Sequence, residues 1–256
     1  MREHEPYDPN ANDPMGAAKA NMRAPVIKRF YERASVAEAD GGFALRLDGR
    51  GARTPGKAPL VAPRHAIAEL IAAEWDAQGE VIEPWTMLAT RLANSAIDGV
   101  AKTLDETRAE IARYAGSDLV CYRAEAPPDL IAMQAAAHDP VLAWAREALG
   151  AEFRVTSGVV YVEQPRAATQ RIEAALGRWD DAFAVAALHV LTSLAGSALI
   201  ALKLAHGATG AEDAWRAAHV DEDFQIEKWG WDRESQERRE ARWSGFATAA
   251  KVIAAL

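Results

Sequence analysis

The stretch PRHAIAELIAAEW at residues 63–75 marks the place where the periodicity of the sequence changes. Before it, apolar residues come in short runs that are typical of strands; within it, Ile67, Leu70, Ile71 and Trp75 recur at helical spacing. Pro63 stands where the first turn of a helix tolerates a proline, because the amide that proline lacks would have no partner there. The stretch therefore predicts a β-rich segment followed by a mainly helical one.

The segment before Pro63 is typical of short antiparallel strands. Runs of apolar and β-branched residues occupy positions 26–31, 35–39 and 43–47. Asp40-Gly41-Gly42 lies between the last two runs and Asp48-Gly49 follows the third, and both contain residues that accept a positive φ in hairpin turns. We therefore expect a β-rich N-terminal domain over residues 25–84.

The rest of the chain, residues 85–256, is predicted to form an α-helical C-terminal domain. Apolar stripes at helical spacing run through residues 92–114 and 130–148, with a restart at Pro140, and further helices are expected at about 166–177, 180–206, 210–228 and 232–255. Residues 153–163 alternate around Ser157-Gly158 and predict one short hairpin. Residues 1–24 carry prolines and asparagines without an apolar period, which indicates a flexible tail. The predicted fold class is α+β, with a small antiparallel β-rich module followed by a larger helical one.

The composition excludes several classes of protein. The 256 residues are 50% apolar with a net charge of −8, which is typical of a packed globular chain. Without a sustained Lys/Arg stripe, this acidic balance argues against nucleic acid or membrane insertion as the basis of function. Cys121 is the only cysteine, so an intrachain disulfide and a cysteine cluster for metal are excluded. The N-terminal sequence resembles neither a secretion signal nor a presequence, and we expect a cytoplasmic protein.

Motifs of catalysis are incomplete in this sequence. The segment GARTPGKA at residues 51–58 has the spacing of a phosphate-binding P-loop up to its last position. Ala58 lacks the hydroxyl that would bind magnesium and Pro59 lacks an amide donor, so a turn-containing loop is the preferred interpretation. The six histidines do not have the spacing of helical zinc or di-iron sites. We therefore expect no catalytic residue, no metal and no cofactor.

Carboxylates and aromatic residues alternate between residues 221 and 240. This region contains Glu222, Gln225, Glu227, Trp229 and Asp232. Aromatic anchors surrounded by charge are typical of protein interfaces. The same spacing also fits a solvated helix face with i,i+4 ion pairs such as Arg233–Glu237, and both interpretations stand at this point.

Glu240 is a further candidate because it is aligned with the apolar stripe that begins at Trp243 on the last predicted helix. A carboxylate on an apolar face is unfavourable unless it is paired or functional. Arg239 and Arg242 could complete a structural ion pair with it. The alternative is that Glu240 serves a protein interface.

Several combinations of residues resemble one known family over roughly residues 26–240. They include Asp48-Gly49-Arg50, the run Glu74-Trp75-Asp76-Ala77-Gln78-Gly79, and the spacing of Glu222, Gln225, Trp229-Gly230 and Asp232. These motifs are similar to those of the assembly chaperones of F-type ATP synthase that bind the α subunit of the catalytic sector. The family is known from mitochondria and α-proteobacteria.

The resemblance implies a chaperone that is not an enzyme. It would bind the free α subunit and prevent its aggregation until β subunits replace it, without ATP hydrolysis, and it would be a monomer when free. By motif, Glu222 and Asp232 are the implied partner-binding residues, and we add Glu240, Glu227, Gln225, Trp229 and Arg50 as expected partner-binding residues. Two alternatives stay open. One is a hydrolase or transferase that uses Glu222 or Glu227 as general base, and the other is an adaptor whose acidic face binds a different basic protein.

Overall fold

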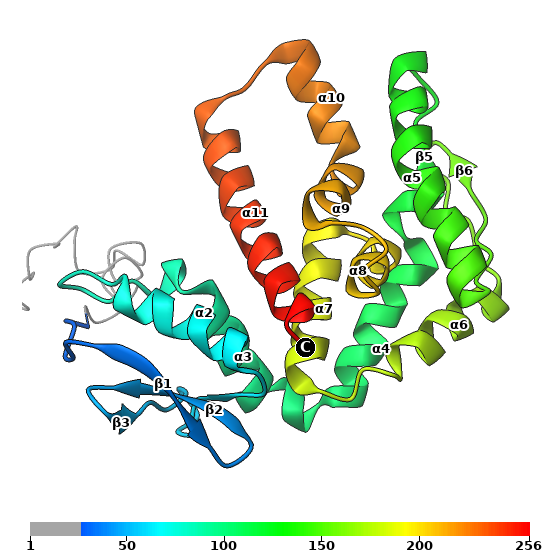
Figure 1. Cartoon of the computed structure of the whole chain (residues 1–256). Helices are drawn as coiled ribbons and strands as arrows, with labels where there is room; N and C mark the ends of the chain where they lie inside the picture. The colour runs from blue at the N-terminus through cyan, green and yellow to red at the C-terminus, as the bar shows by residue number, and fades with distance from the viewer. Residues whose placement is uncertain (1–26) are drawn as a thin grey trace, which may run out of the picture.

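A computed structural model describes residues 27–256 and arranges them as a small sheet beside a larger group of helices (Figure 1). The predicted fold class is confirmed, because the antiparallel strands come first and the helices follow. The tail predicted over residues 1–24 lies outside the described residues.

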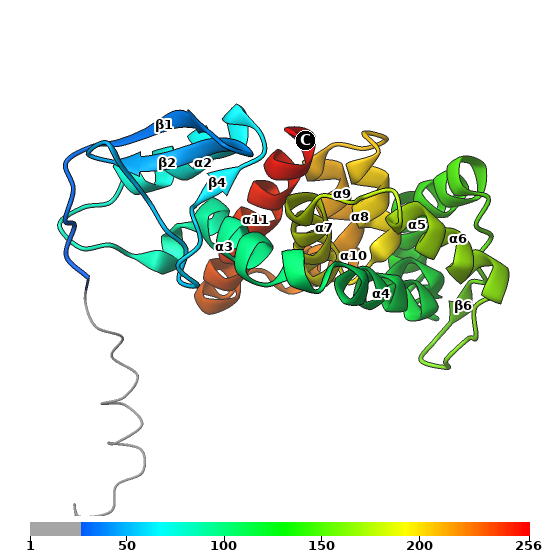
Figure 2. The same cartoon turned by 90° about the horizontal axis from the view of Figure 1, so that it is seen from below.

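The sheet is built on a β-hairpin. β1 (Ala34–Ala39) pairs antiparallel with β2 (Gly42–Leu47), and the short strands β3 (Arg50–Gly51) and β4 (Val61–Ala62) also pair with β2. Asp48 and Gly49 both have positive φ, 48° and 78°, as the tight turn between β2 and β3 requires. α2 (His65–Asp76) lies across β1 and β2 and buries Ile67 and Ile71 against them (Figure 2). The predicted switch from strands to helix after Pro63 is thus confirmed.

The run predicted as a strand at residues 26–31 is wrong. In its described part, only Lys28 forms a β-bridge, with Val81. Beside this bridge, the Arg29 amide donates to the Glu80 carbonyl at 2.9 Å and the Ile82 amide donates to the Ile27 carbonyl at 2.8 Å. The guanidinium of Arg29 adds a hydrogen bond to the main-chain oxygen of Asp76 at 3.0 Å. The arm is therefore held by one short bridge and a side-chain anchor, and a longer strand does not form.

The Glu74–Gly79 motif joins the sheet to the helices. The Glu74 carboxylate accepts hydrogen bonds from the amides of Ala89 and Thr90, at 2.6 and 2.8 Å. These amides belong to the first turn of α3 (Leu88–Asp98), where they have no partner within the helix. Gln78 accepts from the amide of Glu83 at 2.7 Å and holds the intervening loop. The motif is therefore a structural joint between α2 and α3.

The remaining elements follow in chain order. They are η1 (Pro84–Thr86), η2 (Val100–Lys102), α4 (Leu104–Tyr114), η3 (Ala115–Ser117), η4 (Leu119–Cys121), β5 (Tyr122–Arg123), α5 (Pro128–Leu149), β6 (Thr156–Ser157), α6 (Arg166–Leu176), α7 (Ala182–Ala195), α8 (Ala198–Ala205), α9 (Ala211–Ala218), α10 (Val220–Trp229) and α11 (Arg233–Ala254).

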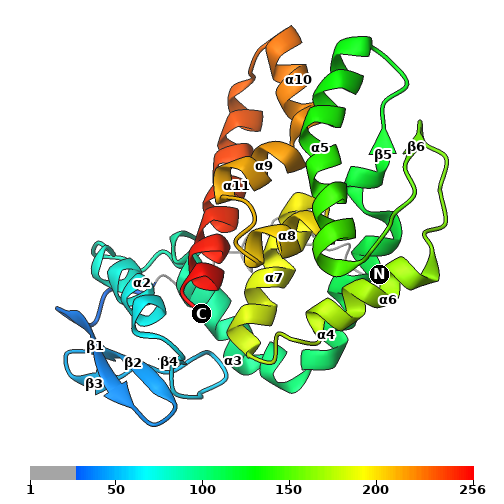
Figure 3. The same cartoon turned by 45° about the vertical axis from the view of Figure 1, so that its right-hand side comes forward.

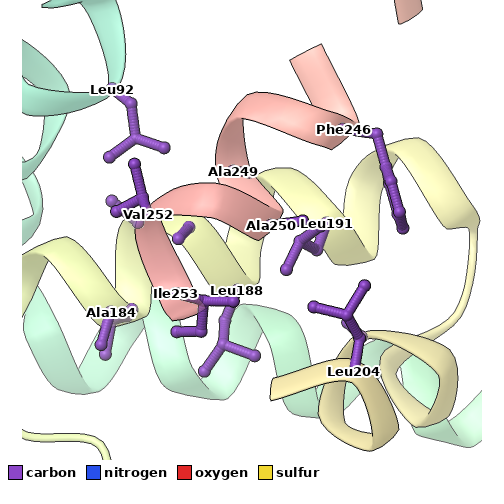
Figure 4. Close-up of a cluster of buried hydrophobic side chains, with 14 of the residues drawn as sticks. Leu92, Ala184, Leu188, Leu191, Leu204, Phe246, Ala249, Ala250, Val252 and Ile253 are labelled. Atoms are coloured by element: carbon purple, nitrogen blue, oxygen red, sulfur yellow. The ribbon is translucent and has the colours of Figure 1, made fainter. Parts of the chain in front are cut away.

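α7 is the central helix of this group. It packs against α3, α4, α8 and α11, and its Leu188 and Leu191 are fully buried. Phe246, Val252 and Ile253 of α11 cover this part of α7 (Figure 4). Since α11 also contacts α3, the last helix ties the sheet side of the molecule to the helical core.

The helical boundaries differ from the prediction in three places, and the first is the stripe at residues 92–114, which is divided into α3 and α4. The helix expected at 180–206 is divided at Gly196, which adopts a left-handed conformation with φ 65°, and at Ser197, whose Oγ accepts from the Ile200 amide at 3.0 Å. Together they end one helix and cap the next. The helix expected at 210–228 is likewise divided at His219.

Two other expectations are wrong. The hairpin expected at 153–163 is wrong in its pairing, because Thr156–Ser157 pairs in parallel with Tyr122–Arg123 from a distant part of the chain. The expected restart at Pro140 is also wrong, since α5 continues through this proline. The Pro140 carbonyl accepts from the ammonium group of Lys203 at 3.2 Å.

Asp118 gives the core a defined pH dependence. It is fully buried, and its carboxylate accepts from the amides of Val120 and Leu199, at 3.2 and 3.1 Å. Burial raises the pKa of Asp118 from 3.8 to about 6, although these hydrogen bonds act in the opposite direction. Between these two values the folded protein binds more protons than the unfolded chain at this site. The contribution of Asp118 to stability is therefore full below about pH 4 and lost as the pH rises through about 6.

We expect the Asp118→Asn variant to lack this dependence. Urea denaturation gives the free energy of unfolding of both proteins at each pH. The natural protein's value minus the variant's should fall by about 2–3 kcal/mol between about pH 4 and 7. Asp98→Asn is the control. Hydrogen bonds from Thr54 and Gly56 lower the pKa of Asp98 from 3.8, so its contribution is lost only as the pH falls below about 4, and the corresponding difference should stay nearly constant between about pH 4 and 7. A difference for Asp118→Asn that is flat over this range would contradict the prediction.

Candidate partner-binding site

α10 and α11 form a helical hairpin at the end of the molecule remote from the sheet (Figures 1 and 3). We use the name α10–α11 hairpin for residues 220–242. Gly230 reverses the chain direction with φ 81°, a value that favours glycine. Asp232 begins α11 as its N-cap, because its Oδ1 accepts from the Ser235 amide at 2.9 Å. Hydrogen bonds from Ser235 hold the pKa of Asp232 below its usual value.

Glu222 lies at the centre of an ion-pair network between the two helices. Its carboxylate is 2.8 Å from Nη2 of Arg242 and 3.1 Å from Nη1 of Arg239. Arg239 also pairs with Asp223, and its side chain is only 12% exposed. Because several charges share the network and one guanidinium is largely buried, this arrangement holds α10 and α11 together more firmly than isolated surface pairs would.

Aromatic side chains pack beneath this network. Trp215 of α9 is buried against Trp243 and Phe246 of α11, with ring centroids 5.5 and 5.4 Å apart. The guanidinium of Arg239 lies over Trp215 at 5.9 Å and over Trp231 at 5.7 Å. Arg239 therefore connects the ion pairs of the hairpin to its aromatic base.

The end of the hairpin presents polar and aromatic groups to solvent. Trp229 is 78% exposed, and Gln225 and Glu227 on the same helix are exposed as well. A large aromatic side chain left in water is unfavourable for an isolated protein and is typical of interaction surfaces. These three predicted residues therefore lie where a partner could reach them.

Glu240 does not form the ion pair that was one of its two interpretations. Arg239 and Arg242 both pair with carboxylates of α10. The Glu240 carboxylate is exposed and accepts from the side chain of Gln236 at 2.9 Å. Burial on α11 begins only further along the helix, so Glu240 lies beyond the apolar part of the stripe. It is a solvent-accessible carboxylate.

Arg50 lies apart from the other predicted residues. It belongs to β3 and is exposed beside a hollow that Phe30 and Trp75 also line. Figures 1 and 3 place β3 and α10 at opposite ends of the molecule. A contribution of Arg50 to partner binding would require a second contact surface.

The roles of Arg239, Arg242 and Trp215 are not evident from the amino-acid sequence. Glu240 is one and two residues away from these arginines on the same helix, a spacing at which side chains do not face each other. Their shared partner, Glu222, lies on α10, and helical spacing within α11 gives no information about it. Trp215 carried no signal beyond its apolar character.

Other chemistries find little support in the described part of the chain. Residues 27–256 contain no group of three or more His, Cys, Asp or Glu side chains that could hold a metal ion. Asp118, the buried carboxylate with a raised pKa, is enclosed by amides of η4 and α8 and is remote in sequence from Glu222 and Glu227. Over the same residues, no helix is both long and apolar enough to cross a membrane.

Comparison with known proteins identifies close relatives. The family model described as ATP12 chaperone protein matches residues 28–146. The solved structure of a candidate chaperone from Agrobacterium tumefaciens is 45% identical and aligns over 96% of this chain and 92% of its own, with a TM-score of 0.86. The crystal structure of Atp12 from Paracoccus denitrificans is 38% identical over 89% of this chain and 97% of its own, with a TM-score of 0.81. An aspartate-to-lysine mutant of that protein matches with the same values.

Proposed function

The chain belongs to the ATP12 chaperone family, and from this premise we propose that it assists assembly of the catalytic sector of F-type ATP synthase. It binds the free α subunit in the bacterial cytoplasm and prevents its aggregation until β subunits replace it. A subunit of an alternating ring exposes large apolar interfaces before assembly. A chaperone that covers such a surface and later yields it needs rapid association and moderate affinity.

The observation that carries this proposal is the charge state of the α10–α11 hairpin. Its five cationic side chains are all engaged in ion pairs with carboxylates of the chain. Glu227 and Glu240 are exposed, and among residues 27–256 neither has a cationic partner. The charged groups of the hairpin that remain outside ion pairs are therefore negative, and they lie beside exposed tryptophans. This combination favours fast association with a basic surface and aromatic anchoring afterwards.

The partner-binding residues divide into two groups. Glu227, Glu240, Gln225 and Trp229 are exposed and would contact the α subunit directly. Glu222 and Asp232 are engaged within the hairpin and would act by holding its shape. A role for Arg50 is kept as a second, separate contact.

The chaperone would act without hydrolysing ATP. The loop at residues 51–58, which resembles a P-loop in spacing, is occupied by a carboxylate of the chain itself. Asp98 accepts from the Thr54 hydroxyl at 2.7 Å and from the Gly56 amide at 2.8 Å. A negative side chain at these donors opposes phosphate binding there.

The test is to refold isolated ATP synthase α subunit with this chain and to analyse the mixture by size-exclusion chromatography, with and without β subunit. We expect a soluble complex of the chain with α, and we expect β to release the chain from it. Bovine serum albumin at the same concentration is the control for general crowding. If α aggregates as it does alone, the proposed function is wrong.

A further inference from the structure

A hollow of about 400 Å³ opens between α9 and α11, beside the base of the α10–α11 hairpin. Three tryptophans line it. Trp215 is buried, Trp243 is partly buried, and Trp231 is half-exposed. Indole faces attract cations because their π-systems carry partial negative charge, and the guanidinium of Arg239 already lies over two of them. The walls are therefore suited to a positively charged group.

Two arginines and two glutamates line the hollow, and only the arginines form ion pairs. The two arginines, Arg216 and Arg239, pair with carboxylates outside it: Arg216 with Asp213, and Arg239 with the α10 carboxylates. The two glutamates, Glu212 and Glu240, line the hollow as well, and neither has a cationic partner within residues 27–256. The hollow thus presents, beside three indoles, two carboxylates that form no ion pair within residues 27–256.

We propose that this hollow receives a lysine or arginine side chain of the α subunit. The proposal rests on the function proposed above and names the chemistry of one contact. A cation that enters the hollow would neutralise Glu212 and Glu240 and would extend the stack that Arg239 makes with the tryptophans. An apolar side chain would leave both carboxylates near an apolar neighbour without a counter-charge, which is unfavourable. A carboxylate would be repelled.

The test compares two hollow variants with two matched surface variants. Glu212→Gln/Glu240→Gln removes both charges and keeps the shape, and Trp231→Ala removes the exposed indole. Glu173→Gln on α6 and Trp85→Ala on η1, where the side chain is 67% exposed, change the same residue types outside both the hollow and the α10–α11 hairpin. The dissociation constant for refolded α subunit is measured for each, at low and at high NaCl. Thermal unfolding confirms that each variant is folded.

We expect each hollow variant to bind α about tenfold more weakly, while the two surface variants change the dissociation constant by less than about threefold. The glutamine double variant should also lose much of the salt dependence of binding, because its charges no longer contribute. If natural protein binds α and the hollow variants bind equally well, the hollow is not the cation site and the proposed function still stands. If natural protein does not bind α at all, both proposals are wrong.

Discussion

Replacing Glu222 with lysine is expected to detach α10 from α11 and to abolish binding of the α subunit. The natural carboxylate contacts two guanidinium groups, at 2.8 and 3.1 Å. Lysine at this position would put a third cation beside Arg239 and Arg242, and Arg239 is largely enclosed and cannot move into water without losing its aromatic contacts. The hairpin should open locally, because most of its contacts lie outside the central core.

Hydrogen exchange measures this effect directly. Amides of residues 220–240 should exchange at least about tenfold faster in the Glu222→Lys variant, whereas those of β1, β2 and α7 should be unchanged. Glu237→Lys is the matched control, since Glu237 forms an exposed pair with Arg233 on one helix and crosses no helix boundary. Equal protection of the hairpin in Glu222→Lys and in natural protein would show that the network is not what holds it.

Phe246→Ala is expected to lower the free energy of unfolding by about 3–5 kcal/mol. The Phe246 side chain is 0% exposed and lies among side chains of α7, α8 and α9 (Figure 4). Its removal leaves a cavity beneath the aromatic base of the hairpin. Because small domains are stable by only about 5–15 kcal/mol, this loss is a large part of the total.

Urea denaturation followed by circular dichroism checks the value. Phe30→Ala provides the control, because the same residue type is deleted at a position that is 68% exposed, and we expect a change of less than about 1 kcal/mol there. Similar losses in the two variants would mean that the environment of Phe246 is not as tightly packed as described.

The first prediction removes a carboxylate that pairs with the N-terminal half of α11, and the second removes a side chain of its C-terminal half. The N-terminal half of α11 is exposed and carries the charges that pair with α10, whereas its C-terminal half contributes Phe246, Val252 and Ile253 to the core. A binding hairpin that projects from a protein needs a rigid base. Here the same continuous helix supplies both the projecting arm and its anchor, so the arm has a defined direction.

Local features of the sequence determined most of the elements. The Asp48-Gly49 turn needs only residues that accept positive φ, and the helix after Pro63 needs only its apolar spacing. Gly196-Ser197 carries an equally local signal, since glycine ends helices and serine begins them, and the break there could have been predicted. The acidic and aromatic character of residues 221–240 is likewise evident from the amino-acid sequence, because it is a property of composition.

The tertiary structure decided which distant groups meet. Thr156–Ser157 pairs with Tyr122–Arg123, and no local rule distinguishes this partner from the near one that a hairpin would use. Arg239 and Arg242 have Glu240 beside them on their own helix but pair with carboxylates of α10. An i,i+3 or i,i+4 rule evaluates only neighbours on one helix. The ion pairs of Arg239 and Arg242 instead form with carboxylates that the fold brings close from another helix. The sequence by itself therefore determined most of the elements and the chemistry of the site, and the ion pairs between α10 and α11 decided which carboxylates stay free for a partner.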